Sequence, residues 1–427
     1  MGISIPRWLV VCRAMASRFK RAYVRPCVVR TVPSEAGDRF PHACRDPIVM
    51  GYNGHEKCRN ERKETTVKRP NDVRPFLQHE DLVVRRYALE YFNQMVCEDV
   101  DLLPRVLAGL EGLPLKKQRQ LVSESSRLTQ SPESMEALGR LIKGEPFVRD
   151  AAESSFLNAP ASLLKEFEEY AALLSYQGQQ DFRRKIAVLE INTPELVSRT
   201  MQLIDRGQGP LGATDKRYAM CTYLIREICW RPDAPRQELR QWIAQGLHKE
   251  DDAGFPVAAL AVSAARYLHL TDLGYELLDY LEVDDDWLRE EAEQSITALA
   301  TPELIDKIRR RYPRESWDFR LWSSAVLAGF KHQVSESVAL SLLKSERDED
   351  LRAELARALC SLLSMKGIPE VKRVMASLDD TEFMELAEPI YVNCVINGVD
   401  DPDLPVWRKT IEHMEANVEA YLDQLGY

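Results

Sequence analysis

Runs of carboxylates recur along this 427-residue chain, and they are the residues whose type and spacing could most directly do chemistry. The runs are Glu250–Asp252, Asp284–Asp286, Asp348–Asp350, Asp379–Asp380 and Asp400–Asp401. Asp and Glu in the turn before a helix cap its free amides and complement its dipole, which explains each run without a ligand. If the same turns align along one edge of a repeated structure, they also form a negative ridge that attracts a basic partner. The spacing excludes an EF-hand calcium loop, because the pattern D-x-D-x-D-G-x-x-x-x-x-E does not occur.

Tryptophans lie close to these acidic runs. Trp287, Trp317 and Trp322 fall within 36 residues. Large aromatic side chains anchor many protein interfaces, although helical spacing indicates that most of these pack between repeats. Trp287 follows three aspartates at an expected helix start, so we expect it to be exposed. The candidate partner-binding residues are therefore Asp284, Asp285, Asp286, Trp287, Trp322, Asp348, Asp350, Asp379 and Asp380.

Motifs that would indicate catalysis or a cofactor are absent from the sequence. The patterns G-x-S-x-G, H-E-x-x-H and the P-loop do not occur. GQGPLG at 207–212 matches the dinucleotide pattern by letter, but a helical pattern precedes it instead of a strand, so we interpret it as a loop. HAC at 42–44 and HEKC at 55–58 lack the paired C-x-x-C spacing of a zinc site. We expect no catalytic residue, cofactor or metal, although a site assembled from distant repeats would leave no local motif.

The elements that carry these residues recur with a nearly constant period. An equivalent position begins the same apolar helix pattern at Arg85, Lys117, Arg149, Arg183, Arg217, Val257, Arg289, Arg320, Arg352 and Met384. By subtraction the steps are 32, 32, 34, 34, 40, 32, 31, 32 and 32. Such a period is typical of stacked helical repeats, in which each repeat buries its apolar face against its neighbours. The step of 40 indicates an insertion around PDAPRQ at 232–237.

Each repeat reads as an acidic turn, a first helix, a short loop and a second helix. Apolar residues at helical spacing make one stripe of the first helix. In two repeats this stripe consists of Leu288, Ala292, Ile296 and Leu299, and of Leu351, Leu355, Ala358, Leu359 and Leu362. Second helices begin with SPES at 131–134, TPEL at 193–196 and 301–304, and IPEV at 368–371. Ser or Thr supplies a cap oxygen there, and Pro suits the first helical position.

This unit resembles the short HEAT-type repeat of phycobilin lyases. The resemblance rests on the run acidic–x–Leu/Val–Arg–x–x–Ala, as at 286–292 and 350–356, and it covers about residues 75–395. It implies an all-α fold, a right-handed α-α superhelix (α-solenoid) of about ten helix pairs whose Arg-bearing helices line the concave face. It also implies a polar ladder between turn aspartates and helix arginines. The arginines of this ladder are Arg85, Arg149, Arg289, Arg320 and Arg352.

Charge divides the chain into a basic start and an acidic body. Residues 1–74 contain 16 Lys and Arg against 7 Asp and Glu, which gives +9, so the net charge of −10 leaves −19 for residues 75–427. Nucleic-acid affinity depends mainly on cations that neutralise phosphates, so we expect no nucleic-acid groove. We divide the body into an array over 75–231 and a second array over 232–427, which ends in a capping helix.

Residues 1–74 show no helical period, because Pro and Arg interrupt each apolar run. SIPRWLVVC is too short and too broken for the apolar region of a secretory signal. The Arg-rich, acid-poor start fits a transit peptide better, but its helical amphipathicity is weak. We interpret the segment as a disordered extension, with residues 1–49 as a mis-assigned start.

The composition indicates a folded protein without a membrane span, since no run approaches 18 apolar residues. The nine cysteines are scattered, and those of the body lie in apolar helical patterns, so we expect buried free thiols and a cytoplasmic location. We expect a non-enzymatic scaffold that binds a basic protein or peptide, with the oligomeric state open. The alternatives are a HEAT-like enzyme, resembling either a bilin lyase or an alkylpurine DNA glycosylase, and a purely structural subunit of an assembly. The acidic body argues against the glycosylase.

Overall fold

The computed structural model describes residues 67–427 apart from 97, 206–215, 247–254, 379 and 425–427. Within these residues every regular element is a helix, which confirms the all-α fold class, and Thr66–Tyr427 forms one compact unit. The first helix begins at Pro70, a few residues before the predicted start of the body. The predictions for residues 1–66, for GQGPLG and for the acidic run at 250–252 lie outside the described residues.

The helices follow one another along the chain with short connections. The α-helices are α2 (Pro70–Val73), α3 (Leu82–Gln94), α4 (Leu102–Ala108), α5 (Leu115–Glu124), α6 (Pro132–Lys143), α7 (Pro146–Leu157), α8 (Ala161–Glu166), α9 (Tyr176–Ile186), α10 (Thr193–Asp205), α11 (Lys216–Cys229), α12 (Arg236–Gly246), α13 (Phe255–Tyr267), α14 (Gly274–Leu277), α15 (Asp286–Ala298), α16 (Pro302–Arg311), α17 (Trp317–Gly329), α18 (Gln333–Ser345), α19 (Glu349–Ser361), α20 (Ile368–Met375), α21 (Asp380–Asn397) and α22 (Leu404–Gln424). Short 3-10 turns are η1 (Arg74–Gln78), η2 (Ser125–Arg127), η3 (Glu168–Leu173), η4 (Ala187–Glu190), η6 (Thr271–Leu273), η7 (Leu278–Glu282) and η8 (Tyr312–Arg314).

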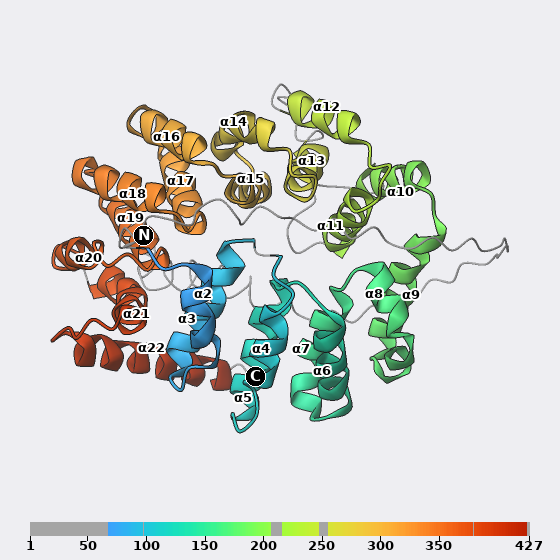
Figure 1. Ribbon diagram of the computed structural model, residues 1–427, viewed down its shortest axis with the longest axis horizontal. Helices are drawn as coiled ribbons and strands as arrows, with labels where there is room; N and C mark the ends of the chain where they lie inside the picture. The colour runs from blue at the N-terminus through green and yellow to red at the C-terminus, as the bar shows by residue number, and fades with distance from the viewer. Residues whose placement is uncertain (1–66, 97, 206–215, 247–254, 379, 425–427) are drawn as a thin grey trace, which may run out of the picture. The chain divides into compact units, whose positions relative to one another are not determined.

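The predicted apolar stripes form the buried sides of α15 and α19. All nine stripe residues are buried, none more than 2% exposed. Both helices belong to a row in which α13, α15, α17, α19 and α21 each contact the next member (Figure 1). Helices α12, α18 and α20 pack against members of this row. Burial against neighbours on either side is what stacked repeats require.

The predicted start signals act as caps in two of the four second helices. Ser131 and Thr301 accept a hydrogen bond from the backbone amide three residues later, at the starts of α6 and α16. At α10 the cap is Asn192 instead, because its side chain accepts from the Glu195 amide at 2.9 Å. The hydroxyl of Thr193 is free to donate to Asp233.

Helices α3, α13 and α19 are each followed, two positions after their last residue, by a residue with positive φ that is not glycine. Val96, His269 and Leu363 all have φ of 51°. After α13 and α19 the amide of the next residue bonds back to a carbonyl five positions earlier, as in a Schellman motif. Glycine usually occupies this position, because a Cβ atom disfavours the left-handed region. These ends therefore carry no glycine signal in the sequence.

The buried apolar side chains form two clusters. One extends from Ala161 to Trp407 and includes α11, α13, α15 and α17. The other gathers the helices from α2 to α9 and is completed by Leu363, Val392, Ile396 and Ile411. The predicted division at 231/232 stays a prediction, but core residues on both sides of it belong to the first cluster.

Because Val392, Ile396 and Ile411 belong to the second cluster, α21 and α22 share a buried core with the helices from α2 to α9. Helix α3 contacts both α21 and α17, although α21 ends the row (Figure 1). Helices α3, α5 and α7 pack in succession, and α11 contacts α13 at the start of the row. The last repeat therefore packs against the first described one, and we call this contact the closure of the row.

Candidate functional site

The acidic turns before α15 and α19 combine capping with exposed charge. Asp285 and Asp348 each accept a hydrogen bond from the backbone amide three residues later, at 2.7 and 3.1 Å. Their neighbours Asp284 and Asp350 have exposed side chains. One aspartate of each turn thus stabilises the helix start while another faces solvent. The remaining candidates are Asp286, Asp379 and Asp380, and their side chains are not among those that the structure describes.

The starts of α15, α17 and α19 lie along one edge of the row. Arg289 in the first turn of α15 lies 3.0 Å from Asp318 in the first turn of α17. Arg320 of α17 lies 3.0 Å from Glu346, which precedes α19. These ion pairs bridge consecutive members of the row. The exposed aspartates therefore belong to an edge that is also cross-linked by charge.

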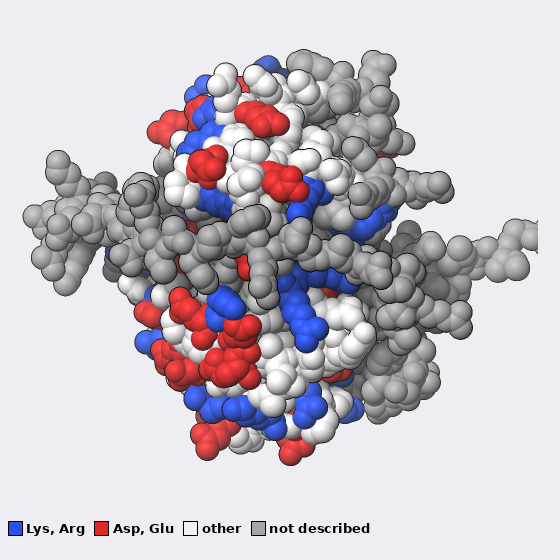
Figure 2. All heavy atoms as spheres, turned by 90° about the vertical axis from the view of Figure 1, so that its right-hand side faces the viewer, with Lys and Arg blue, Asp and Glu red and all other residues white. Residues whose placement is uncertain are grey.

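Several carboxylates of the body form ion pairs. Lys372 lies 2.8 Å from Asp401 and 2.9 Å from Asp403, and the pKa of Asp401 is lowered because Lys372 bonds to it against the effect of burial. Arg311 contacts Glu315 at 2.7 Å. On the side of the molecule over α8–α12, one group of acidic side chains has basic ones beside it (Figure 2). The ridge stays a prediction, and its exposed aspartates among the described residues are Asp284, Asp350 and Asp400.

The expectation that Trp287 is exposed is wrong. Its side chain is 6% exposed and belongs to the larger core cluster. Glu291 and Ser295, one and two turns later on the same side of α15, are buried as well. Since α15 has neighbours in the row on both sides, it buries more than the single stripe that the sequence shows. The position after an acidic turn therefore does not imply exposure.

Trp322 is also partly buried, with the Arg289 guanidinium 6.0 Å from its ring. Among the described residues the exposed tryptophans are Trp230 and Trp317, at 47% and 41%. Trp317 begins α17, on the same edge as Asp284 and Asp350. It is the aromatic residue of this edge that sequence reasoning should have selected.

The ladder arginines use two kinds of acceptor. Arg289 and Arg320 lie 3.0 Å from carboxylates of the next repeat, those of Asp318 and Glu346. Arg85 instead donates to the carbonyls of His79 and Gly109, and Arg149 donates to the carbonyl of Ile142 at 3.0 Å. Carbonyls left free at turns and helix ends are good acceptors for a guanidinium. For Arg352 no partner is seen among the described residues, and the turn that leads into α21 is only partly described.

A column of cations and aromatic rings crosses α9, α11 and α13, and residue spacing alone does not predict it. In order its members are Lys185, Tyr223, Arg226, Trp230, Tyr267 and Arg266. The Lys185 amine lies 4.4 Å from the Tyr223 ring centre. Burial lowers the pKa of Lys185 to about 7, and the nearby Arg226 acts in the same direction. A cation over an aromatic face is attracted by the ring quadrupole, so the column ties three repeats together.

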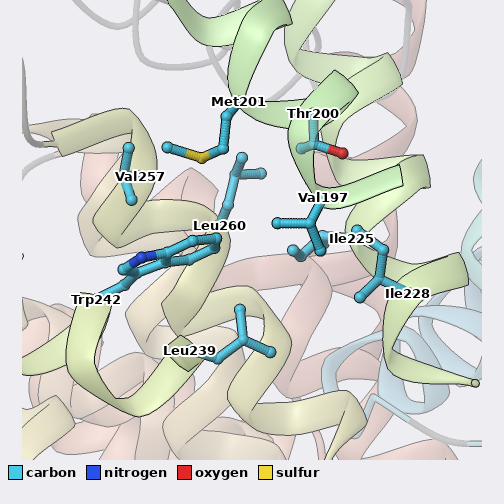
Figure 3. A pocket seen from close by; sticks show the side chains of 9 residues that line it. All are labelled: Val197, Thr200, Met201, Ile225, Ile228, Leu239, Trp242, Val257 and Leu260. Carbon is cyan, nitrogen blue, oxygen red and sulfur yellow. The ribbon is translucent and has the colours of Figure 1, made fainter. Parts of the chain in front are cut away.

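A small apolar cavity lies between α10, α11, α12 and α13 (Figure 3). It measures about 10 Å³ and is lined by Val197, Thr200, Met201, Ile225, Ile228, Leu239, Trp242, Val257 and Leu260. The Thr200 hydroxyl already donates to the Leu196 carbonyl at 2.9 Å. A water molecule needs about 10–15 Å³ and several polar partners. This cavity is therefore a packing gap and not a cofactor site.

We call the contacts of α3 with α17, α21 and α22 the seam. Polar side chains from segments far apart in the sequence meet there. At its first end, the Asp81 carboxylate accepts from the Tyr391 hydroxyl at 2.8 Å and from Arg408 at 3.0 and 3.1 Å. The same carboxylate caps α3 through the Val83 amide. Burial and the Asp81 charge raise the pKa of Tyr391 to about 12, which keeps its hydroxyl a donor. Asp81 thus ties the start of α3 to α21 and α22.

At the middle of the seam, Arg86 lies among carboxylates from three helices. Its guanidinium is 2.9 Å from Glu415 of α22, 3.7 Å from Glu388 of α21 and 3.8 Å from Glu124 of α5. Burial raises the pKa of Glu124, while Arg86 acts in the opposite direction. Arg86 of α3 thus links α5, near the start of the described chain, to α21 and α22 at its end.

At the far end of the seam, Lys331 bonds to the ends of three helices. Its amine donates to the Gln94 side chain at 2.9 Å, to the Ala328 carbonyl at 2.7 Å and to the Ser361 carbonyl at 2.9 Å. These acceptors lie in the last turns of α3, α17 and α19. The ammonium also lies 4.6 Å from the centre of the Tyr91 ring. A cation is well placed here, because helix C-terminal ends are electronegative.

Comparisons with known proteins identify no relative. No protein-family profile matches the chain, and no curated protein sequence is similar to it. The HEAT-type resemblance therefore depends on the repeat period and on the helices themselves.

Three further observations concern possible metal ligands, cysteines and membrane-spanning helices in the described part of the chain. No group of three or more His, Cys, Asp and Glu side chains converges there as metal ligands would. The described cysteines Cys221, Cys229, Cys360 and Cys394 are buried free thiols, as predicted. None of the described helices combines the length and the apolar character needed to cross a bilayer.

Proposed function

We propose that the chain is a helical-repeat scaffold that binds a basic protein or peptide and carries out no chemistry of its own. We further propose that its helices form a right-handed α-α superhelix of about ten pairs, of the short HEAT type. In support, the helices expected at Arg289, Arg320 and Arg352 are consecutive members of one row. Stacking of equivalent helices is how repeat proteins build extended binding surfaces.

The exposed pair Asp284 and Asp350 carries the proposal for the binding surface. Each stands beside an aspartate that caps a helix, so its own charge is available to a partner. Trp317 lies on the same edge and is 41% exposed, which adds an aromatic anchor between the two charges. The inner sides of the Arg-bearing helices are less accessible, because α3 contacts α17 and Arg127 of η2 lies 3.9 Å from Glu290 of α15. The edge is therefore the better surface for a partner.

The test reverses the two exposed charges and leaves the caps intact. A variant with Asp284→Lys and Asp350→Lys is compared with the natural chain for binding a fluorescent lysine- and arginine-rich peptide, by anisotropy at low and moderate salt. We expect the affinity to fall about tenfold, that is by about 1.4 kcal/mol, and the difference to shrink as salt screens the charges.

The matched control is a variant with Glu98→Lys and Glu111→Lys, which changes the net charge equally at exposed turns of the first repeats. It should bind the peptide nearly as the natural chain does. Equal losses in both variants would mean that only the net charge attracts the peptide, and the proposed edge would then be abandoned.

A further inference from the structure

The surface that α3 occupies in the seam is formed by two neighbouring helices at helical spacing. Its residues on α21 and α22 are Tyr391, Val392 and Ile396, and Arg408, Ile411 and Glu415. The steps of one, four, three and four residues place each set on one side of its helix. Apolar residues lie between polar ones, and on α22 the basic Arg408 and the acidic Glu415 are about two turns apart with Ile411 between them. Such a surface has the character of a groove that binds an amphipathic helix.

The helix that occupies this surface shows which chemistry fits it. Asp81 caps α3 and meets Arg408, and Arg86, five residues later, meets Glu415 and Glu388. Val84 lies between these ties and Phe92 lies beyond them, and both are fully buried in the cluster that Val392, Ile396 and Ile411 complete. A helix that fits the surface therefore has an acidic N-cap, an arginine five residues later and an apolar side.

The ion pairs of the seam are individually weak, whereas its apolar residues are buried. The side chains of Arg86 and Glu415 are 23% and 32% exposed, and those of Arg408 and Asp81 are 35% and 15% exposed. Ion pairs that water reaches typically contribute little net stability, because hydration of the separated charges competes with the pairing.

A strained backbone lies directly beyond the end of α3. Val96 has φ of 51°, and a β-branched residue in the left-handed region is a genuine outlier. Close packing at the same end requires Gly329, because a Cβ there would lie 3.0 Å from the Gln94 carbonyl oxygen. Backbone strain of this kind is concentrated at binding and switch regions. Release of α3 would allow this segment to relax.

We propose that α21 and α22 form a helix-binding surface, which α3 covers in the closed chain and which an amphipathic helix of a partner protein takes over when α3 is released. The partner helix carries an aspartate or equivalent N-cap and an arginine five residues into the helix. The surface is separate from the edge of Asp284 and Asp350, so this proposal and the proposed function fail independently.

The test uses the chain's own helix as the probe. A fluorescent peptide with the sequence of residues 81–94 is added to the full-length protein, and its anisotropy is measured. The protein is used in its natural form and as the variant Asp81→Asn, which keeps an N-cap but removes the charge that Arg408 meets. We expect the peptide to bind the variant about tenfold more tightly than the natural chain, because the competing α3 is held less firmly.

Two further changes show where the peptide binds. Adding Glu415→Ala to the Asp81→Asn protein should weaken peptide binding, as should Arg86→Ala in the peptide, whereas Asp400→Ala in the exposed turn before α22 should not. Circular dichroism confirms that each variant is folded, and Arg86→Ala in the protein serves as a second means of weakening the seam. The proposal is overturned if the peptide binds the weakened and natural proteins equally, or if Glu415→Ala leaves binding unchanged.

Discussion

Partly buried cations bond to helix ends at the scale of single residues. Lys331 contacts the last turns of three helices, Lys185 donates to the Leu157 carbonyl at the end of α7, and Arg226 donates to the Asn158 carbonyl at 2.6 Å. Each cation satisfies carbonyls that a helix leaves without an internal partner. These contacts join repeats through backbone groups, which every sequence possesses.

Lys331 makes the stability of the chain depend on pH. Burial lowers the pKa of Lys331 to about 7, with Glu90 and Glu293 acting in the opposite direction, whereas the pKa of an unfolded lysine is about 10.4. Between these values the unfolded state binds more protons, so the free energy of unfolding rises with pH across this window. Below about pH 7 both states are charged, and the cost of burying the ammonium is present in full.

We therefore expect the natural chain to gain stability relative to the variant Lys331→Met as pH rises from about 7 to 10, by up to about 1.4 kcal/mol per pH unit. Urea unfolding of both proteins at several pH values measures this difference. Lys344→Met, at an exposed position of α18, should show a difference that does not change with pH. A constant difference for Lys331→Met as well would mean that the amine is not desolvated as described.

At the scale of elements, helix bodies and starts could be predicted, and several helix ends could not. The stripe from Leu288 to Leu299 follows from apolar spacing, and Ser131 and Thr301 follow from side-chain capping chemistry. The ends after His269 and Leu363 have the left-handed geometry without the glycine that usually marks it. Packing determines the second of these ends: Leu363 is fully buried in the second core cluster, so its side chain is retained despite the strain.

His269 has the same geometry without such a reason, because its side chain is exposed. We expect His269→Gly to raise the free energy of unfolding by about 0.5–1 kcal/mol, since relief of the left-handed strain exceeds the added flexibility of the unfolded chain. Thermal or urea unfolding measures the change. His269→Ala keeps a Cβ atom and should bring no gain, so a glycine variant no more stable than the alanine variant would contradict the explanation.

At the scale of the whole molecule, closure of the row should make distant repeats stabilise one another. Open repeat arrays depend mainly on contacts between neighbours, and their ends can unfold separately. Here Ile411 of α22 belongs to the same buried cluster as the helices from α2 to α9. The stability of the first repeats therefore depends on the last helix.

The variant Ile411→Ala tests this coupling. We expect it to lower the free energy of unfolding by about 2–4 kcal/mol through the cavity it leaves, and to reduce hydrogen-exchange protection in α3 and α5 more than in α13 and α15. Val406→Ala, at a position of the same helix that is 54% exposed, should have little effect. Loss of protection confined to α21 and α22 would show that the first repeats do not depend on the last.

The seam could not be predicted from the sequence for a physical reason. The residues that meet there, such as Asp81 and Arg408, are 327 positions apart. Carboxylates and guanidinium groups recur throughout the chain, so residue type does not identify the pairs. Their meeting depends on the packing of the helices that lie between them in the chain, which leaves no local pattern. Burial of Trp287 has a related origin, because it depends on neighbours on both sides of α15.

Closure also constrains how the protein is made. Helix α3 leaves the ribosome long before α21 and α22, and at about 5–20 residues per second the 327 positions between Asp81 and Arg408 take roughly 16–65 s to synthesise. During that interval the nascent first repeats expose the apolar surface that Val392, Ile396 and Ile411 later cover. The growing chain therefore passes through a stage in which its oldest helices need protection from aggregation until its newest ones arrive.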